Sequence, residues 1–504
     1  MDPKVWGPAS SSVQAAIRAR PDLEGLVLLG AVAAAVLLLI GGAIGDLSRA
    51  RPVVLIGLGL SLASAVVCLV FPDGDAFRLS RLVGTAAASF VFPVALASIA
   101  TAYSGVARAT AIGFAYAFYG VGQALSPTLL TLIPDSRWPA FLASIVACAV
   151  ALRICWNRVP DLESPGHAER PYVFGTALWA CGVVLISTGV LWLGGGLDNP
   201  LRLALVGCGI LLVVAFFAWE WRRRAGHPAT LKVERRPVTI ALFVGLVIAI
   251  AQTVAMVQMP LYFSIVLGFG PLFGIVALAP LFIALVLAGP VAGFLLVRFP
   301  PRTLVTGGML AVGIGNVVVA AVMGAHTSYL AFIVPLALVG GGFVIATTVR
   351  TAIIFASVPR GLPATAAALN EASIAVGSRV GIVLVTAIVA QTAMAALDPL
   401  LAGQSAASAD AARATFQDLL TAVGTPSFSS LVKAIQPGAA GGYVEAYVTG
   451  IRWAMLLGGM AAVAGSLVAW LTLGRGDPLV ARGKDAMAGV YEHRDERVIP
   501  SAAD

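Results

Sequence analysis

The sequence contains a regular series of long apolar runs, and this series limits the possible folds more than any other feature. Each run has roughly 19 to 30 residues, enough to cross the hydrocarbon core of a bilayer as a helix. The sequence therefore predicts an all-α integral membrane protein. We expect about thirteen complete spans, at residues 24–45, 53–71, 79–102, 109–132, 139–157, 172–194, 201–221, 238–266, 271–297, 303–324, 329–355, 363–392 and 449–473.

Composition agrees with a membrane protein and argues against an enzyme. Apolar residues make up 59% of the 504 residues and charged residues only 11%, unlike a soluble domain. The sequence has no metal-ligand spacing, no nucleophile–base–acid set and no phosphate-binding loop. We therefore expect no metal, no cofactor and no enzymatic activity.

The basic residues set the expected orientation. Loops with an excess of Lys and Arg stay in the cytoplasm, and such residues gather in alternate loops and in the tail. This places the 45–52 loop, the basic loop 222–237 and the C-terminus in the cytoplasm. The net charge of +8 then indicates contact with anionic lipid head groups at 222–236 and not with nucleic acid.

The spans group into larger units. We expect an N-terminal half bundle at 23–158, an inserted helix pair at 172–221 and a C-terminal half bundle at 238–474. We also expect an extracellular insertion at 393–448 and a disordered tail at 475–504. Residues 1–22 are too polar for a complete span, so they form either a partial first helix, from a truncated start, or an interfacial segment.

The loop after the first span carries the most specific motif. Gly42, Asp46 and Arg51 fit the pattern Gly-x-x-x-Asp-(Arg/Lys)-x-Gly-(Arg/Lys)-(Arg/Lys). This stretch resembles the signature loop of the major facilitator superfamily, although Leu47 and Arg49 depart from it. The resemblance implies a role in the conformational change, whereas a tight loop obeying the positive-inside rule is the simpler interpretation.

Two further motifs are similar to those of the same superfamily. Gly113, Gly122 and Pro127 match parts of its antiporter motif, in which small residues allow close helix approach and proline bends the helix. Ordinary small-residue packing also explains these glycines. Arg81 resembles the arginine of the Arg-x-x-Gln-Gly motif, which the family associates with proton coupling, although Gly84 replaces the glutamine. Alternatively, Arg81 snorkels to the head groups.

An internal repeat divides the chain into two related halves. Residues 109–127 match residues 364–382 at a constant offset, and this offset makes Tyr116 the counterpart of Glu371. The pair at 172–221 lies between the halves and outside the repeat. Parallel repeats of this kind place the substrate site between the halves, near the bilayer midplane.

Span 363–392 carries the strongest functional signal, Asn370-Glu371 followed by Arg379. An ionisable side chain in an apolar run is costly and is a functional candidate by default. Loss of water favours the neutral form of a carboxyl group, so a buried acid can exchange a proton near neutral pH. We expect Glu371 to carry protons, with Arg379 or Arg81 tuning it. A structural interhelical hydrogen bond remains the alternative.

Other polar residues in the spans are candidates for a substrate cavity. Aromatic rings with a few polar groups suit bulky amphipathic ligands, whereas each polar residue alone is also typical of helix–helix contacts. The candidates are Tyr116, Tyr119, Gln123, Gln252, Gln258, Asn316 and Asn370.

The whole layout resembles the fourteen-helix drug/proton antiporters of the major facilitator superfamily. The resemblance implies two six-helix halves plus an inserted pair, with the first helix incomplete or missing here. It also implies a monomeric, multi-pass cell-membrane protein that exports lipophilic compounds by alternating access, driven by protons. Two alternatives stay open: export of an anionic or lipid-like metabolite with Arg81 and Arg379 as counter-charges, and a non-transporting sensor or scaffold.

Overall fold

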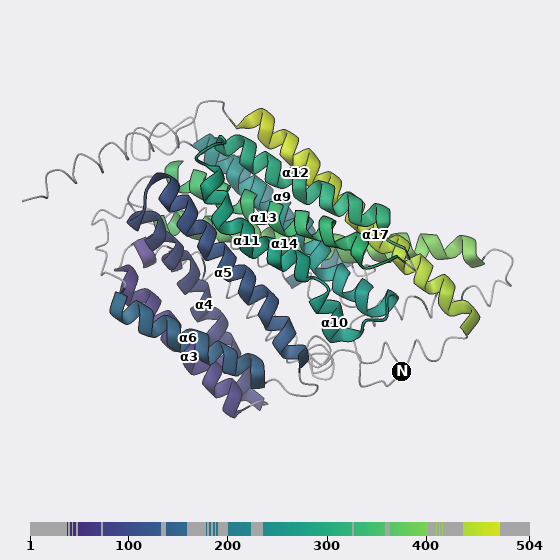
Figure 1. The fold of residues 1–504 in the computed structure, drawn as a ribbon, viewed down its shortest axis with the longest axis horizontal. Helices are drawn as coiled ribbons and strands as arrows, with labels where there is room; N and C mark the ends of the chain where they lie inside the picture. Colours follow the sequence, from purple (N-terminus) through teal and green to yellow (C-terminus); the bar gives the residue numbers. More distant parts are fainter. Residues whose placement is uncertain are drawn as a thin grey trace, which may run out of the picture.

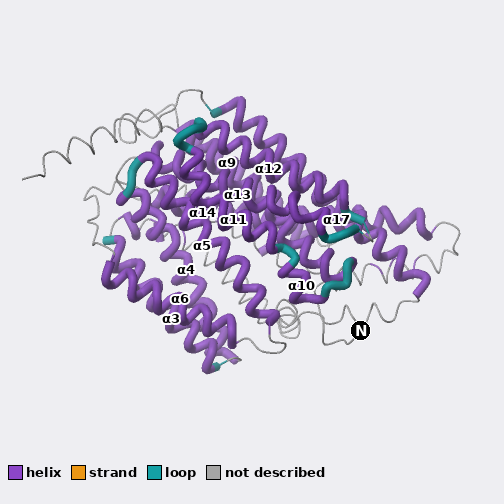
Figure 2. The backbone as a smooth tube through the Cα atoms, viewed as in Figure 1, coloured by secondary structure: helices purple, strands orange, loops and turns teal. Residues whose placement is uncertain are grey.

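The computed structural model describes residues 38, 41–42, 44–46, 49–71, 74–132, 138–158, 178, 181–182, 185–186, 188–189, 200–222, 235–324, 327–357, 363–401, 410, 413, 416 and 437–473. These residues are overwhelmingly helical, and no strand occurs among them (Figure 2). The expected segments 1–22 and 475–504, and most of the basic loop 222–237, lie outside this part of the chain.

The helices follow the order of the expected spans. They are α3 (Ala50–Val70), α4 (Gly74–Ala102), α5 (Gly105–Leu132), α6 (Trp138–Arg158), α8 (Pro200–Arg222), α9 (Arg235–Leu261), the π-helix η4 (Tyr262–Val266), α10 (Gly270–Val276), α11 (Ala279–Leu295), α12 (Pro301–Val322), α13 (Leu330–Ser357), α14 (Pro363–Leu397), the 3₁₀-helix η5 (Asp398–Leu401) and α17 (Pro437–Thr472). Nine helices of the described residues are long and apolar enough to cross a membrane. The expected all-α membrane fold is confirmed.

Two expected spans are interrupted. Residues 271–297 form α10 and α11, separated by a turn at Ala277–Leu278. Pro280 lies in the first turn of α11, where the missing proline N–H costs nothing because that turn has no intrahelical acceptor. Residues 238–266 end in the π-helix η4, which begins two residues after Pro260 of α9.

Two helices are longer than the bilayer core. α14 has 35 residues and α17 has 36, so each measures about 50 Å against a hydrocarbon core of about 30 Å. Both continue into residues 393–448, which the sequence predicts as an extracellular insertion. The expected span stops at the polar pair Gln391-Thr392, whereas α14 continues through five further apolar residues to Leu397.

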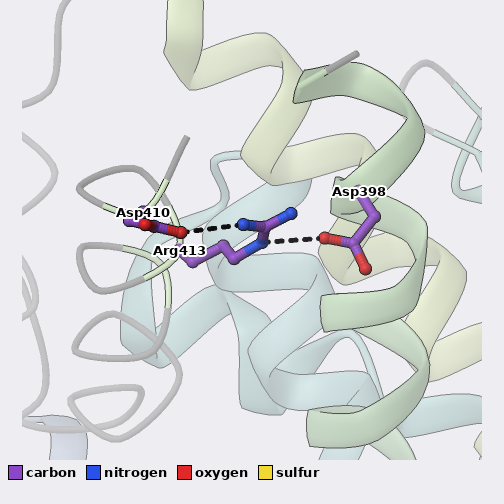
Figure 3. Close-up of polar contacts among 3 residues, drawn as sticks. All are labelled: Asp398, Asp410 and Arg413. Carbon is purple, nitrogen blue, oxygen red and sulfur yellow. Dashed lines mark hydrogen bonds and ion pairs between the residues drawn. The ribbon is translucent and has the colours of Figure 1, made fainter. Parts of the chain in front are cut away.

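The described residues of this insertion contact both long helices. The ring of Phe416 stacks on that of Tyr443 in α17, with centroids 5.2 Å apart. The Arg413 guanidinium donates to Asp398 at the end of α14 and to Asp410, each at 2.9 Å (Figure 3). All three charged side chains are exposed, so these ion pairs orient the segment but contribute little stability.

The helices form two groups that meet along α5 (Figure 1). α3 packs against α4 and α6, while α9 and α11 to α17 pack among themselves. α5 belongs to the N-terminal half in sequence but packs mainly against α11 and α13 of the C-terminal half. The contact between the halves is therefore built largely on α5.

The inserted pair packs beside α14. Ile186, Val213 and Phe216 belong to one buried cluster with small residues of α14, including Ala368 and Val376. A Cβ atom on Gly209 would lie 2.8 Å from the Gly182 carbonyl oxygen, so the two inserted segments approach each other closely. Within the expected span 172–194, the structure describes only residues 178, 181–182, 185–186 and 188–189.

Candidate functional site

A buried hydrogen-bond network joins the two halves. The Tyr116 hydroxyl of α5 donates to Glu371 Oε1 of α14 at 2.6 Å. Asn370 Nδ2 donates both to the Tyr116 oxygen and to Glu371 Oε1, at 2.9 Å each. Thr351 of α13 lies 3.1 Å from the Tyr116 hydroxyl and donates to Asn370 Oδ1 at 3.2 Å. The network thus joins α5 of the N-terminal half to α13 and α14 of the C-terminal half.

The arrangement around Glu371 suits a charged acceptor. One of its oxygens accepts two hydrogen bonds, and bonds to an ionised acceptor are roughly twice as strong as neutral ones. Tyr116 is 2% exposed and Asn370 is fully buried, so water cannot replace these donors. Glu371 as a whole residue is half-buried.

Arg350 of α13 was not identified from the sequence. It is fully buried and donates to the Ala241 carbonyl of α9, to Ser373 Oγ and to the Asn370 carbonyl, at 3.3, 3.1 and 3.4 Å. The rule that singled out Glu371, an ionisable residue within an apolar run, applies equally to Arg350 in the run 329–355. Arg350 lies beside the network, whereas Arg81 and Arg379 were the expected cations.

One turn beyond Tyr116, a wall of aromatic and polar side chains begins. The Phe92 ring of α4 contacts Tyr116 and Tyr119, with centroids 6.1 and 5.9 Å apart. Tyr119 is 39% exposed, and a buried oxygen of Gln123 has no hydrogen-bond partner among the described residues. Arg379, two turns beyond Glu371, donates only to the Ala375 carbonyl of its own helix, at 3.4 Å.

Arg81 lies in a different place. It lines a pocket of about 380 Å³ between α3, α4 and α6, together with Ser61, Phe141 and Cys148. Phe92 borders both this pocket and the Tyr116 ring. The structure therefore separates Arg81 from the Glu371 network, although one phenylalanine contacts both regions.

Three predicted cavity residues lie inside the C-terminal half. Asn316 of α12 is fully buried and donates to the Ala251 carbonyl of α9 at 3.0 Å, which is a helix–helix contact. Gln252 and Gln258 of α9 are also buried, and each has a side-chain polar atom without a hydrogen-bond partner among the described residues. These two amides keep hydrogen-bonding capacity inside the bundle.

Asp46 caps the first turn of α14. Its carboxylate accepts from the backbone N–H groups of Ala364 and Thr365, at 2.7 and 2.9 Å. The first N–H groups of a helix have no intrahelical acceptor and carry partial positive charge, so a carboxylate satisfies them well. Burial raises the pKa of the Asp46 carboxyl above its ordinary value, and these hydrogen bonds offset part of the rise.

The other signature-loop residues are also packed. A Cβ atom on Gly42 would lie 2.8 Å from the Ala364 carbonyl oxygen, so only glycine allows this approach to α14. Arg51 donates to the Trp156 carbonyl at 2.6 Å, in the last turn of α6 where carbonyl groups lack intrahelical donors. The loop thereby contacts one helix of each half.

The glycines of the antiporter-like motif differ from each other. A Cβ atom on Gly113 would lie 2.0 Å from the carbonyl oxygen of Gly289 in α11, so the two backbones touch at this crossing. A Cβ atom on Gly122 would meet nothing within 4 Å. Pro127 lies inside α5 beyond both glycines. Only Gly113 is required for close approach in this conformation.

No group of three or more His, Cys, Asp and Glu side chains in the described part of the chain could hold a metal ion. The network contains one acid, a phenol, an amide and a hydroxyl group, and Arg350 lies beside it. Such a set can bind and release a proton and can change its hydrogen bonds when it does so.

Comparison with known proteins gives one family match. The family model described as Major Facilitator Superfamily matches residues 9–382, which is most of the chain. Among solved structures, the human organic anion transporter MFSD10 (TETRAN) superposes with a TM-score of 0.50 at 14% identity, covering 87% of this chain and 84% of that one. This likeness concerns the fold alone.

Two curated relatives confer resistance, according to their names. The puromycin resistance protein pur8 of Streptomyces alboniger is 32% identical over 288 residues, covering 55% of this chain and 56% of that protein. The multidrug resistance protein Stp of Mycobacterium tuberculosis is 23% identical over 392 residues, covering 75% and 71%. The chain thus spans only about half the length of the first relative.

Proposed function

Because the chain belongs to the major facilitator superfamily of membrane transporters, we propose that it exports lipophilic small molecules in exchange for protons, by alternating access to a cavity between its halves. The family match confirms the expectation of a transporter rather than an enzyme. The names of the resistance relatives support export of drug-like compounds. We further propose a monomer in the cell membrane with a cytoplasmic C-terminus, in keeping with the basic loops.

The observation that carries the proposal is the bond between Tyr116 and Glu371 across the two halves. While Glu371 is ionised, it accepts charge-assisted bonds from Tyr116 and from Asn370. A proton on the carboxyl group removes that charge and weakens both bonds by roughly half. Protonation therefore loosens the contact between α5 and α14, and proton binding becomes coupled to the movement of the halves.

The packed end of the bundle supports alternating access. Asp46 binds the start of α14, and the Gly113–Gly289 crossing closes α5 onto α11. Both contacts join an N-terminal element to a C-terminal one at the end expected to be cytoplasmic. We propose that this closed end opens when Glu371 is protonated, with Gly42 and Arg51 as further parts of the gate and with Gly122 and Pro127 adjusting α5.

We propose that substrate binds along the aromatic and polar wall above the network. Phe92 and Tyr119 offer ring faces to an apolar ligand, and the unpartnered oxygen of Gln123 offers a hydrogen bond. Tyr116 and Asn370 form the floor. Gln252, Gln258 and Asn316 are secondary candidates, because each keeps a polar atom without a partner among the described residues, although Asn316 also donates from its amide nitrogen to α9.

The decisive experiment measures protons released by the purified full-length chain in a weakly buffered detergent solution. Puromycin and ethidium serve as cationic probes, and taurocholate serves as an anionic one. Wild type should release protons on binding at least one probe, and Glu371→Gln should release none. Glu445→Gln, which changes an exposed acid on α17, is the matched control and should behave as wild type. Equal release from wild type and Glu371→Gln would refute Glu371 as the carrier.

A second candidate, export of an anionic or lipid-like compound, rests on Arg379. This arginine forms no ion pair with a described carboxylate and lies next to the proposed substrate wall. Release provoked by taurocholate but by neither cation would favour this function. If no probe is bound or moved by the wild-type chain, the non-transporting sensor or scaffold becomes the better interpretation.

A further inference from the structure

The surroundings of Arg350 are built to hold a cation. A Cβ atom on Gly245 of α9 would lie 2.3 Å from Arg350 Nη1, so a glycine makes the space for the guanidinium group. The group donates to α9 through the Ala241 carbonyl and to α14 through Ser373 and Asn370. Arginine stays protonated in proteins, so these contacts fix a positive charge between three helices.

This cation is buried without a direct ionic partner among the described residues. Arg350 is fully buried, its Nε atom has no hydrogen-bond partner among the described residues, and the three oxygen atoms to which it donates are all neutral. A buried charge is costly even where carbonyl groups solvate it, and a negative charge within electrostatic reach lowers that cost. Arg350 binds the backbone carbonyl of Asn370, and the next residue in the chain is Glu371.

Few other ionisable side chains lie near Arg350 and Glu371. α5 presents Tyr116, which donates to Glu371, and Tyr119 one turn further on. α14 itself presents Arg379 two turns beyond Glu371, and α13 presents Arg350. No described residue of α4, α9 or α17, which also pack against α14, forms a hydrogen bond or ion pair with the Glu371 carboxyl group.

We propose that Arg350 is the internal counter-charge of Glu371: its fixed positive charge stabilises the ionised carboxylate from a distance and so sets the pH at which Glu371 exchanges its proton. This rests on the proposed role of Glu371 as the proton carrier. Arg350 is a positioning residue, because it touches Glu371 only through the backbone of Asn370. Without a direct ion pair, the carboxyl group stays free to bind a proton and to change its bond with Tyr116.

The test measures the protonation of the Glu371 carboxyl group directly and needs no substrate. Infrared difference spectroscopy detects the carbonyl stretch of a protonated carboxyl group in the purified full-length protein, and Glu371→Gln identifies the band that belongs to Glu371. The midpoint of its pH titration is then compared between wild type and four variants. Arg350→Gln and Arg350→Met remove the charge, Arg350→Lys keeps it, and Ser373→Ala removes one hydrogen-bond partner but no charge.

The expected result separates charge from packing. Loss of an opposite charge near a carboxyl group raises the pH of half-protonation, so both neutral variants should move the midpoint upward by about one to two pH units. Arg350→Lys and Ser373→Ala should keep the wild-type midpoint, even where their thermal stability falls. The second neutral variant keeps the comparison possible if Arg350→Gln does not fold.

Two results would overturn the inference in different ways. An unchanged midpoint in folded Arg350→Gln or Arg350→Met would show that Arg350 is only structural, and Glu371 could still carry the proton. Absence of any titrating Glu371 band in wild type would remove the proton carrier and the role of Arg350 together. A shift in Arg350→Lys as large as in Arg350→Gln would assign the effect to geometry and not to charge.

Discussion

At the scale of single residues, the Tyr116 hydroxyl group links the two halves by hydrogen bonds. It donates to Glu371, accepts from Asn370 and lies within hydrogen-bond distance of Thr351. Its ring is buried and contacts Phe92, so the ring and the hydroxyl have separate roles. Removal of the oxygen alone should therefore leave the packing in place.

Tyr116→Phe should lower the free energy of unfolding by about 1 to 2 kcal/mol, because it removes a hydrogen bond to a charged acceptor inside the membrane. Equilibrium unfolding in mixed detergent measures the loss. In the Glu371→Gln background the same change should cost less than half as much. Tyr119→Phe is the control, since no hydrogen bond joins its hydroxyl to Glu371 among the described residues, and an equal effect of both variants would contradict the proposed contact.

At the scale of helices, the crossing of α5 and α11 depends on glycine backbones in contact. The Cβ positions of Gly113 and Gly289 each lie within 2.2 Å of the other residue's carbonyl oxygen. Backbone atoms cannot move aside as a flexible side chain can. This crossing is therefore the least tolerant point of the interface between the halves.

Gly113→Ala should cost about 1 to 3 kcal/mol through overpacking and should impair transport. Gly122→Ala, which changes a second glycine of the same motif, should be neutral or stabilising by up to about 1 kcal/mol, because alanine favours the helix and nothing lies in its way. Measurements of the melting temperature and the export rate of both variants test this difference. Equal losses in the two variants would mean that the motif acts by something other than packing.

The sequence predicts the helices better than it predicts the network. The spacing and length of the apolar runs are enough to predict the order of the spans, because the thickness of the bilayer sets the length of a spanning helix. The sequence also identifies Glu371 as a functional candidate, because an acidic side chain in an apolar run is costly. Arg350 lies about two turns before the end of its run, where an arginine could also reach the head groups, and only packing shows that it is buried. The repeat pairs Tyr116 with Glu371 but does not predict their contact.

At the scale of the whole molecule, the proposed alternating access requires the two halves to separate at the Asp46 end, where they touch in this structure. Asp46 and its neighbours hold the start of α14, while the opposite end of α14 continues beyond the bilayer core. A covalent bond between the halves at the Asp46 end should prevent that separation without changing either half.

The double variant Gly45→Cys, Ala364→Cys provides such a bond in a background without the five native cysteines. A Cβ atom on Gly45 would lie 2.8 Å from that of Ala364, so a small shift reaches the spacing of about 3.8 Å found in disulfides. Oxidation should stop export of puromycin or ethidium, and dithiothreitol should restore it. If export continues although gel mobility shows that the cross-link has formed, opening at this end is excluded. Each single cysteine variant serves as a control.

The bond between Tyr116 and Glu371 also locates the symmetry of the molecule. Two positions related by a twofold rotation can touch only where the rotation axis passes between them. Tyr116 and Glu371 are equivalent positions of the repeat, and their side-chain oxygens are 2.6 Å apart. Two ionised carboxylates at this distance would repel each other. An acid on one side and a phenol on the other avoid that repulsion, so the two halves differ chemically at the point where these equivalent positions meet.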